Sequence, residues 1–246
     1  LGPEVSRYSF DFFPDYIYLA TYLFAAIIQI INFLILIFIN IKKPIPSKKI
    51  NRPLGDVLLQ KNLIIAILAA AVGYSLMSFI MTATPLQIVN VCKLGDSASA
   101  TVIQWHVIAM FAPSFFTGTI INSLGNRKVM MIGLFLYAFS ISFTIIGQTI
   151  EHFWIALFLC GLGWNFLYVG GSDIIAKSAL PEERAKVQGV TDFIIFVFVA
   201  TGSFLAGALH STLGWEIMMF YTSIPIFILF MSIIIINPDG GIKARH

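Results

Sequence analysis

Seven long apolar stretches constrain this chain more than any other feature of its sequence. They run over Tyr16–Ile41, Leu63–Val91, Val102–Ile121, Val129–Ile150, Phe153–Ile175, Val187–Leu209 and Trp215–Ile236. Each is long enough, as a helix, to cross the ~30 Å hydrocarbon core of a bilayer. A membrane barrel would instead need strands of alternating polarity, and we find no such alternation. The sequence therefore predicts an all-α integral membrane protein with seven transmembrane helices.

Composition agrees with a membrane protein and excludes several other classes. Hydrophobic residues make up 58% of the chain and charged residues only 11%, whereas soluble domains carry about 25% charged residues. No basic patch is interleaved with aromatic residues, so no nucleic-acid partner is expected. Cys92 and Cys160 are far apart and have no histidine at ligand spacing, so neither a metal site nor another cofactor is expected. Because the chain begins at Leu1 and no signal peptide follows, we interpret it as a piece of a longer protein.

Lysine and arginine in the short loops predict the orientation, because such residues collect on the cytoplasmic side. With the amino terminus outside, the outer loops contain only Arg7 and Lys93. The cations on the cytoplasmic side would be Lys42, Lys43, Lys48, Lys49, Arg52, Lys61, Arg127, Lys128, Lys177, Arg184, Lys186, Lys243 and Arg245. We therefore expect a multi-pass protein of the cytoplasmic (inner) membrane, with its amino terminus outside and its carboxyl terminus in the cytoplasm.

The basic stretch after the first span divides the chain. It contains Pro44, Pro46 and Pro53, which disfavour helix, and six cations suited to the anionic leaflet. The expected divisions are an outer loop and leading helix at 1–41, a basic cytoplasmic loop at 42–62, a six-helix bundle at 63–237 and a cytoplasmic tail at 238–246. The six spans form two triplets, each ending in an almost uniformly apolar span. This pattern indicates a three-plus-three inverted repeat with the fourth and seventh spans on the outside.

Polar residues recur on one face of several spans, where they cost free energy and need a reason. The candidates for lining a substrate cavity are Tyr74, Ser78, Thr82, Gln104, His106, Asn165 and Tyr168. The alternative is that these groups hydrogen-bond between helices, while neighbouring glycines allow close packing. A strongly anionic substrate has no obvious counter-ion here, because no lysine or arginine lies mid-span. The residues favour a small neutral, zwitterionic or aromatic solute, such as a vitamin, sugar or drug.

Two titratable residues lie well inside spans and are candidates for proton coupling or gating. His106 lies in the outer half of its span, and Asp192 is the only carboxylate well inside a span. A neutral structural histidine is the alternative for His106, and an acid that complements a helix amino terminus is the alternative for Asp192. Asp173 is expected to form an i,i+4 surface pair with Lys177.

The short polar hairpin loop from Gly118 to Lys128 carries a recognisable pattern. It resembles the signature loop G-x-L-a-D-r-x-G-r-r/k of the major facilitator superfamily. The matching residues are Gly118, Ile120, Gly125, Arg127 and Lys128. Three positions differ: Asn122 replaces the acid, and Ser123 and Asn126 replace basic residues. The first glycine is expected to allow close helix approach and the second to free the turn.

A second loop strengthens this resemblance. Residues 180–189 are similar to the P-x-x-x-R-g-x-a-x-G loop of the same family, and the matching residues are Pro181, Arg184 and Gly189. The resemblance covers essentially the whole chain but implies only about half of a twelve-helix protein. The leading span then resembles the sixth helix, and the other six spans resemble helices seven to twelve.

The resemblance implies secondary active transport of a small solute by alternating access, coupled to protons as a symporter, together with a missing amino-terminal half as partner. One alternative is a truncated or split half without activity of its own. Another is a seven-helix receptor-like protein, which explains neither loop motif. An enzyme is not expected, since His106 and Asp192 are too few titratable groups for a membrane-embedded active site.

Overall fold

The computed structural model describes residues 13, 16, 18–39 and 52–238, and these residues are mostly helical with no strand among them. Most of the expected outer segment, residues 42–51 of the basic loop and the tail from residue 239 lie outside the described residues. Contacts divide the chain into one unit at Leu1–Lys48 and another at Lys49–His246. The first unit contains the helix α2 (Leu19–Phe38), which matches the leading span.

The second unit is a helical bundle. Its helices, in chain order, are α3 (Leu54–Leu58), α4 (Lys61–Pro85), the π-helix η1 (Leu86–Val91), α5 (Asp96–Phe111), α6 (Ser114–Leu124), α7 (Asn126–Ile146), α8 (Ile150–Ser178), α9 (Arg184–Leu213), α10 (Trp215–Tyr221) and α11 (Ser223–Ile236). Across the described residues, six stretches are long and apolar enough to span a membrane, or seven if the bent pair α5–α6 is one span. The predicted fold class is confirmed, whereas the three-plus-three repeat stays a prediction.

Three features of the spans differ from the hydropathy pattern, two internal breaks and one boundary. The third span is not one straight helix, because α5 and α6 meet at 45° around Ala112 and Pro113. Ile150 was expected to end the fourth span but instead begins α8. The last span is interrupted at Thr222, between α10 and α11. Hydropathy averaged over a whole span does not detect such breaks, because the average stays apolar across them.

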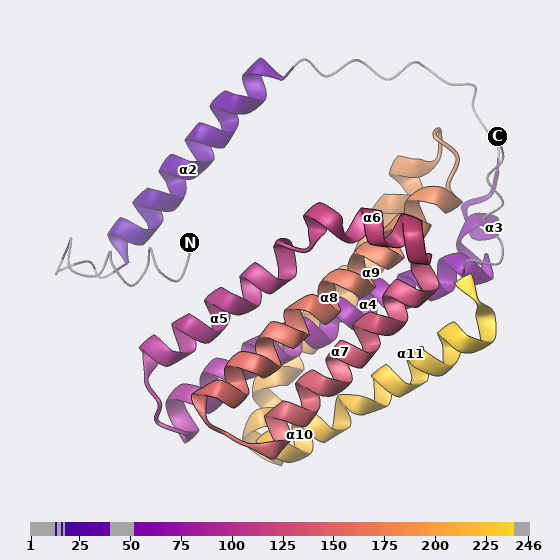
Figure 1. The fold of residues 1–246 in the computed structure, drawn as a ribbon. Coiled ribbons are helices and arrows are strands. Elements are labelled where there is room, and N and C mark those ends of the chain that lie inside the picture. Colours follow the sequence, from indigo (N-terminus) through magenta and orange to yellow (C-terminus); the bar gives the residue numbers. More distant parts are fainter. Residues whose placement is uncertain (1–12, 14–15, 17, 40–51, 239–246) are drawn as a thin grey trace. The chain divides into compact units, whose positions relative to one another are not determined.

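Helix α8 lies at the centre of the bundle, between α5 and α7 and in front of α4 (Figure 1), and it packs against all three. Glycines allow these close contacts: a Cβ added at Gly163 would lie 3.0 Å from the Gly133 carbonyl oxygen of α7. One added at Gly171 would lie 2.7 Å from the Ala66 carbonyl oxygen of α4. Small residues at helix contacts are how membrane bundles gain packing energy without a hydrophobic drive.

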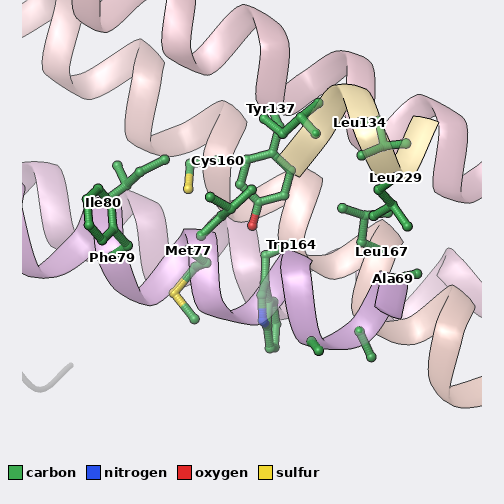
Figure 2. Close-up of a cluster of buried hydrophobic side chains, with 14 of the residues drawn as sticks. Ala69, Met77, Phe79, Ile80, Leu134, Tyr137, Cys160, Trp164, Leu167 and Leu229 are labelled. Atoms are coloured by element: carbon green, nitrogen blue, oxygen red, sulfur yellow. The ribbon is translucent and has the colours of Figure 1, made fainter. Parts of the chain in front are cut away.

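The core forms where α4, α7 and α8 meet, with α11 completing it. Figure 2 shows Tyr137, Cys160 and Leu167 of this core together with Met77 of α4 and Leu229 of α11. The Tyr137 hydroxyl, fully buried, donates to the Gly73 carbonyl at 2.6 Å. Donation to a main-chain carbonyl satisfies a polar group that would otherwise be costly to bury.

The most exposed helix of the unit is α9. Only five of its 30 residues are buried, against nine of the 21 residues in α7. We expected α7 and the last span to be the peripheral helices, and within this unit α9 is less covered than α7. The sequence shows which helices carry polar residues. It does not show which helices are buried against other helices of this unit.

Candidate substrate site and gating loops

An aromatic cluster gathers side chains from four helices. Trp164 and Tyr168 of α8 stack with ring centroids 5.1 Å apart and an angle of 8° between their planes. Tyr74 of α4 sets its edge against both rings at 5.4 Å. Phe196 of α9 lies 5.7 Å from Tyr74, and Phe111 of α5 lies 5.8 Å from Trp164. The cluster therefore joins two predicted cavity residues, Tyr74 and Tyr168, in one aromatic platform.

Trp164 brings an unused hydrogen-bond donor to this platform. Its side chain is 5% exposed, and its indole Nε1 is buried without a hydrogen-bond partner among the described residues. Figure 2 shows this nitrogen in blue. Buried indole N–H groups usually find a partner, so the unpaired donor marks a place where an acceptor would be stabilised.

Ser78 lies one turn beyond Tyr74 on α4 but serves helix packing. Its hydroxyl oxygen lies 2.6 Å from that of Ser203 of α9. The neighbouring Ser75 hydroxyl donates to the Phe198 carbonyl of α9 at 2.9 Å. Thr82 is exposed, one turn further along. The polar stripe predicted on α4 thus has one aromatic-cluster residue, one interhelical contact and one exposed residue.

His106 lies inside the interface between α5 and α8. Its side chain is fully buried, and its Nδ1 lies 2.7 Å from the Leu157 carbonyl oxygen. A carbonyl only accepts, so Nδ1 carries the hydrogen. The other ring nitrogen, Nε2, is buried with no partner among the described residues. Gln104, on the same helix, is half-buried.

Asn165 of α8 hydrogen-bonds to residues on both sides of the break between α5 and α6. Its Nδ2 donates to the Met110 carbonyl and to the Ser114 hydroxyl, both at 2.7 Å, and its Oδ1 lies 2.6 Å from the Thr117 hydroxyl. Pro113 lacks an N–H, so the helix loses a hydrogen bond there. The predicted cavity residue Asn165 is fully buried and satisfies the groups around this bend.

Asp192 faces polar neighbours within α9 and from α8. Gln188 Nε2 donates to its carboxylate at 2.7 Å, and the carboxylate interacts electrostatically with the Tyr168 phenol. The predicted coupling acid thus lies near one residue of the aromatic cluster, Tyr168. His106 lies in the α5–α8 interface, so the two coupling candidates occupy separate places.

The first loop motif forms the turn between α6 and α7. Gly125 has φ +84°, a conformation that favours glycine, as expected for a freed turn. Arg127 Nη2 donates to the Ile234 carbonyl of α11 at 3.2 Å, while Lys128 and Asn122 are exposed. The expected close approach at Gly118 is not found in this unit, since no heavy atom lies within 4 Å of a Cβ added there.

A motif position that departs from the family pattern has a structural role. Asn126 is 5% exposed. Its Nδ2 donates to the Gly170 carbonyl at 2.9 Å and to the Asp173 carboxylate at 2.8 Å. The same carboxylate accepts from Lys177 at 2.6 Å, which confirms the predicted i,i+4 pair. Asn126 therefore attaches the start of α7 to the end of α8, a role that the sequence pattern did not reveal.

The second loop motif forms the turn between α8 and α9. The Leu180 carbonyl accepts from the N–H groups of Glu183 and Arg184. Glu183 also pairs with Arg52 at 3.6 Å. Pro181 and Arg184 are exposed, and nothing lies within 4 Å of a Cβ added at Gly189.

Across the described residues, no three His, Cys, Asp or Glu side chains are grouped so as to hold a metal ion.

Comparison with known proteins places the chain in a family. The model of the Major Facilitator Superfamily matches residues 89–244. A protein called riboflavin transporter RfnT, from Brucella anthropi, is 39% identical over 220 residues, which cover 88% of this chain and 55% of that protein. The Bacillus subtilis protein described as uncharacterized MFS-type transporter YdeG is 35% identical, covering 60% of this chain and 35% of its own length. Multidrug resistance protein 2 of Bacillus subtilis is 22% identical, covering 64% and 39%.

These relatives indicate the same family as the two loop motifs and, like the motifs, match only part of a longer protein. The matched part of the chain spans 55% of the length of RfnT and 35% of the length of YdeG. Its match to the family model covers more than half of its own residues, and its described residues form the all-helical, membrane-suited bundle that the motifs imply. The chain belongs to the Major Facilitator Superfamily.

Proposed function

We propose that this chain supplies the carboxyl-terminal half of a secondary transporter that moves a small, neutral, planar aromatic solute of the riboflavin type. The observation that carries the proposal is the aromatic cluster around Trp164 and Tyr168. The relative named a riboflavin transporter supports the same substrate class. A flavin is a flat aromatic ring system with a hydroxylated side chain, so it suits stacking surfaces bordered by neutral polar groups.

The charge distribution favours an uncharged solute. Within α4, α5, α8 and α9, lysine and arginine occur only in the first or last turns, at Lys61, Lys177, Arg184 and Lys186. An anion at the aromatic cluster would have no cation to replace its hydration. A flavin ring would offer carbonyl oxygens and ring nitrogens to the unpaired N–H of Trp164, at no cost in charge.

Alternating access requires a second half that this chain does not supply. In the proposed arrangement the two halves rock around a site near the middle of the membrane. The half-length match to relatives supports this division, and the basic loops support an amino terminus outside and a carboxyl terminus in the cytoplasm. The amino-terminal half is therefore the proposed partner in the inner membrane, and the 246-residue chain alone is expected not to transport.

Coupling to protons is the proposed driving force. Asp192 is the best-placed group, because its carboxylate interacts with Tyr168 of the aromatic cluster. A proton on Asp192 would change the hydrogen bonding next to the bound solute. His106 lies in the α5–α8 interface and offers its unpartnered Nε2 as a second proton acceptor.

Uptake of radiolabelled riboflavin tests the proposal. The full-length protein is produced in a bacterium that cannot make riboflavin or take it up by another route, and initial rates are measured. Removing a ring by Tyr168→Leu is expected to raise KM roughly two- to tenfold, because an aromatic pair contributes about 0.5–1.5 kcal/mol beyond its area. Trp164→Phe keeps one aromatic ring in place of the indole but removes the donor, and a similar rise is expected.

Phe158→Leu is the matched control. Phe158 lies on the same helix and stacks on Trp154 at 5.6 Å, outside the cluster. It should leave KM unchanged. If wild-type protein at normal membrane levels takes up no riboflavin, the substrate assignment fails. If Tyr168→Leu and Phe158→Leu give equal kinetics, the aromatic cluster is not the site.

A further inference from the structure

A lateral cavity of about 660 Å³ lies between α4, α9 and the α10–α11 helices. Its walls include Leu76, Phe79, Leu205 and Met218. These residues fall within three membrane-suited stretches. Wall residues on α9 are well exposed, with Leu205 at 40% and Val197 at 48%. The cavity is therefore an open, mostly apolar recess at the depth of the lipid chains.

The few polar groups in this recess are already satisfied by the protein. The Ser75 hydroxyl donates to the Phe198 carbonyl, the Thr201 hydroxyl to the Val197 carbonyl and the Thr222 hydroxyl to the Met219 carbonyl. These hydroxyls have no free hydrogen left to donate and can only accept, so a polar ligand would gain few hydrogen bonds here in exchange for its lost hydration. The recess therefore selects an apolar occupant.

A second, polar cavity adjoins the recess at the end of α9. It measures about 360 Å³ and shares Leu213 with the apolar recess. Gln87, Gln148, His210 and Glu216 line it. Gln87 is hydrogen-bonded to Gln148 at 2.7 Å and to His210 at 2.9 Å. An apolar recess that continues into a polar cavity at the helix ends matches a ligand with an apolar chain and a polar head group.

The charge at the polar end narrows the chemistry of the head group. Within residues 52–238 no ion pair neutralises the carboxylate of Glu216. A free carboxylate repels an anionic head group and attracts an ammonium. We propose that the two cavities together bind one phospholipid with an ammonium head group, its acyl chain in the recess and its head group beside Glu216. On the orientation proposed above, this lipid belongs to the outer leaflet.

Photo-crosslinking in nanodiscs tests this binding without relying on transport. The full-length protein is reconstituted with phosphatidylethanolamine or phosphatidylglycerol carrying a diazirine in the acyl chain, and labelled peptides are mapped by mass spectrometry. A groove of about 410 Å³ between α7 and α10–α11, which includes Ala138 and Phe227, is the internal control. It is apolar and has no residue in common with the polar cavity.

Phosphatidylethanolamine is expected to label the α9 recess about fivefold more than phosphatidylglycerol does, the effect of roughly one surface charge. The control groove should be labelled equally by both lipids. Leu205→Trp, or Thr201→Trp if the first variant does not fold, should lower labelling of the recess alone. Glu216→Gln should abolish the difference between head groups.

Three results would overturn the proposal. One is equal labelling of the recess and the control groove. Another is labelling of the recess that neither tryptophan changes, and the third is a recess protected from both lipids, because another segment of the full-length protein then fills it.

Discussion

Asp192 lies about two turns inside α9, where it is the proposed coupling acid. Its carboxylate accepts from Gln188 and interacts with Tyr168. Asparagine in its place has nearly the same shape and can still accept from Gln188, but it cannot take up a proton. Substitution therefore separates the coupling role from the structural role.

The expected result for Asp192→Asn is a loss of accumulation with exchange preserved. Uptake driven by an imposed proton gradient should fall at least about tenfold, and a tenfold change corresponds to about 1.4 kcal/mol. Riboflavin counterflow, which needs no net proton movement, should stay within about twofold. Both are measured in proteoliposomes of the full-length protein.

Asp96→Asn serves as the control, since Asp96 is exposed in the first turn of α5. Accumulation by Asp192→Asn equal to that of wild type would exclude Asp192 from coupling. Loss of counterflow together with accumulation would instead assign Asp192 to solute binding.

At the scale of elements, the bend between α5 and α6 depends on a side chain about 50 residues away. Asn165 satisfies groups on both sides of the break, at Met110, Ser114 and Thr117. Removing its amide takes away these three hydrogen bonds, at about 1–3 kcal/mol for each buried group that is left without a partner. The bend therefore depends on Asn165 of α8 as well as on Pro113.

Asn165→Leu is expected to destabilise the protein by several kcal/mol. Leucine is similar in size but can neither donate nor accept. Thermal unfolding of the purified protein in detergent should show a clear drop in midpoint temperature. Ser142→Ala should change the midpoint little, because Ser142 is exposed and its hydroxyl bonds within its own helix to Ala138. Equal midpoints for both variants would contradict the role of Asn165.

The helices could be predicted from the sequence because membrane spans are long and apolar, but their breaks and contacts could not. Phe111 and Phe196 complete the aromatic cluster, yet in the sequence they are ordinary members of apolar runs. Asn126 was read only as a departure from a motif, although it joins α7 to α8. Each of these roles depends on a partner more than 30 residues away, which no local pattern reveals. Tyr74 and Tyr168 were found because their polar hydroxyls stand out against an apolar background.

At the scale of the whole molecule, two motif glycines lie on open surface. Nothing in this unit lies within 4 Å of a Cβ at Gly118 or Gly189. Within this unit, therefore, neither glycine is required by packing. Small residues at these positions are explained if another part of the full-length protein, the proposed amino-terminal half, packs against them.

Gly118→Leu and Gly189→Leu in the full-length protein are expected to abolish riboflavin uptake while leaving the six-helix unit folded. Leucine favours helix over glycine by about 1 kcal/mol, so local helix stability should not fall. Uptake and far-UV circular dichroism measure the two effects. Gly55→Leu is the control, because Gly55 is equally open but lies in the short helix α3. Normal uptake by both motif variants would show that these surfaces stay uncovered.

The π-helix η1 has a consequence for chain length in this family. Its widened turn lets the Cys92 N–H bond to the Gln87 carbonyl five residues back, at 2.9 Å. It also lets the Cys92 thiol reach the Gln148 amide oxygen at 3.2 Å. A relative with one residue fewer between Pro85 and Lys93 would restore ordinary α-helical winding and rotate the side chains that follow in this helix by about 100°. An insertion or deletion here thus re-aims the end of the helix without altering the rest of the bundle, so a one-residue gap at this point of an alignment marks a change of contact partners.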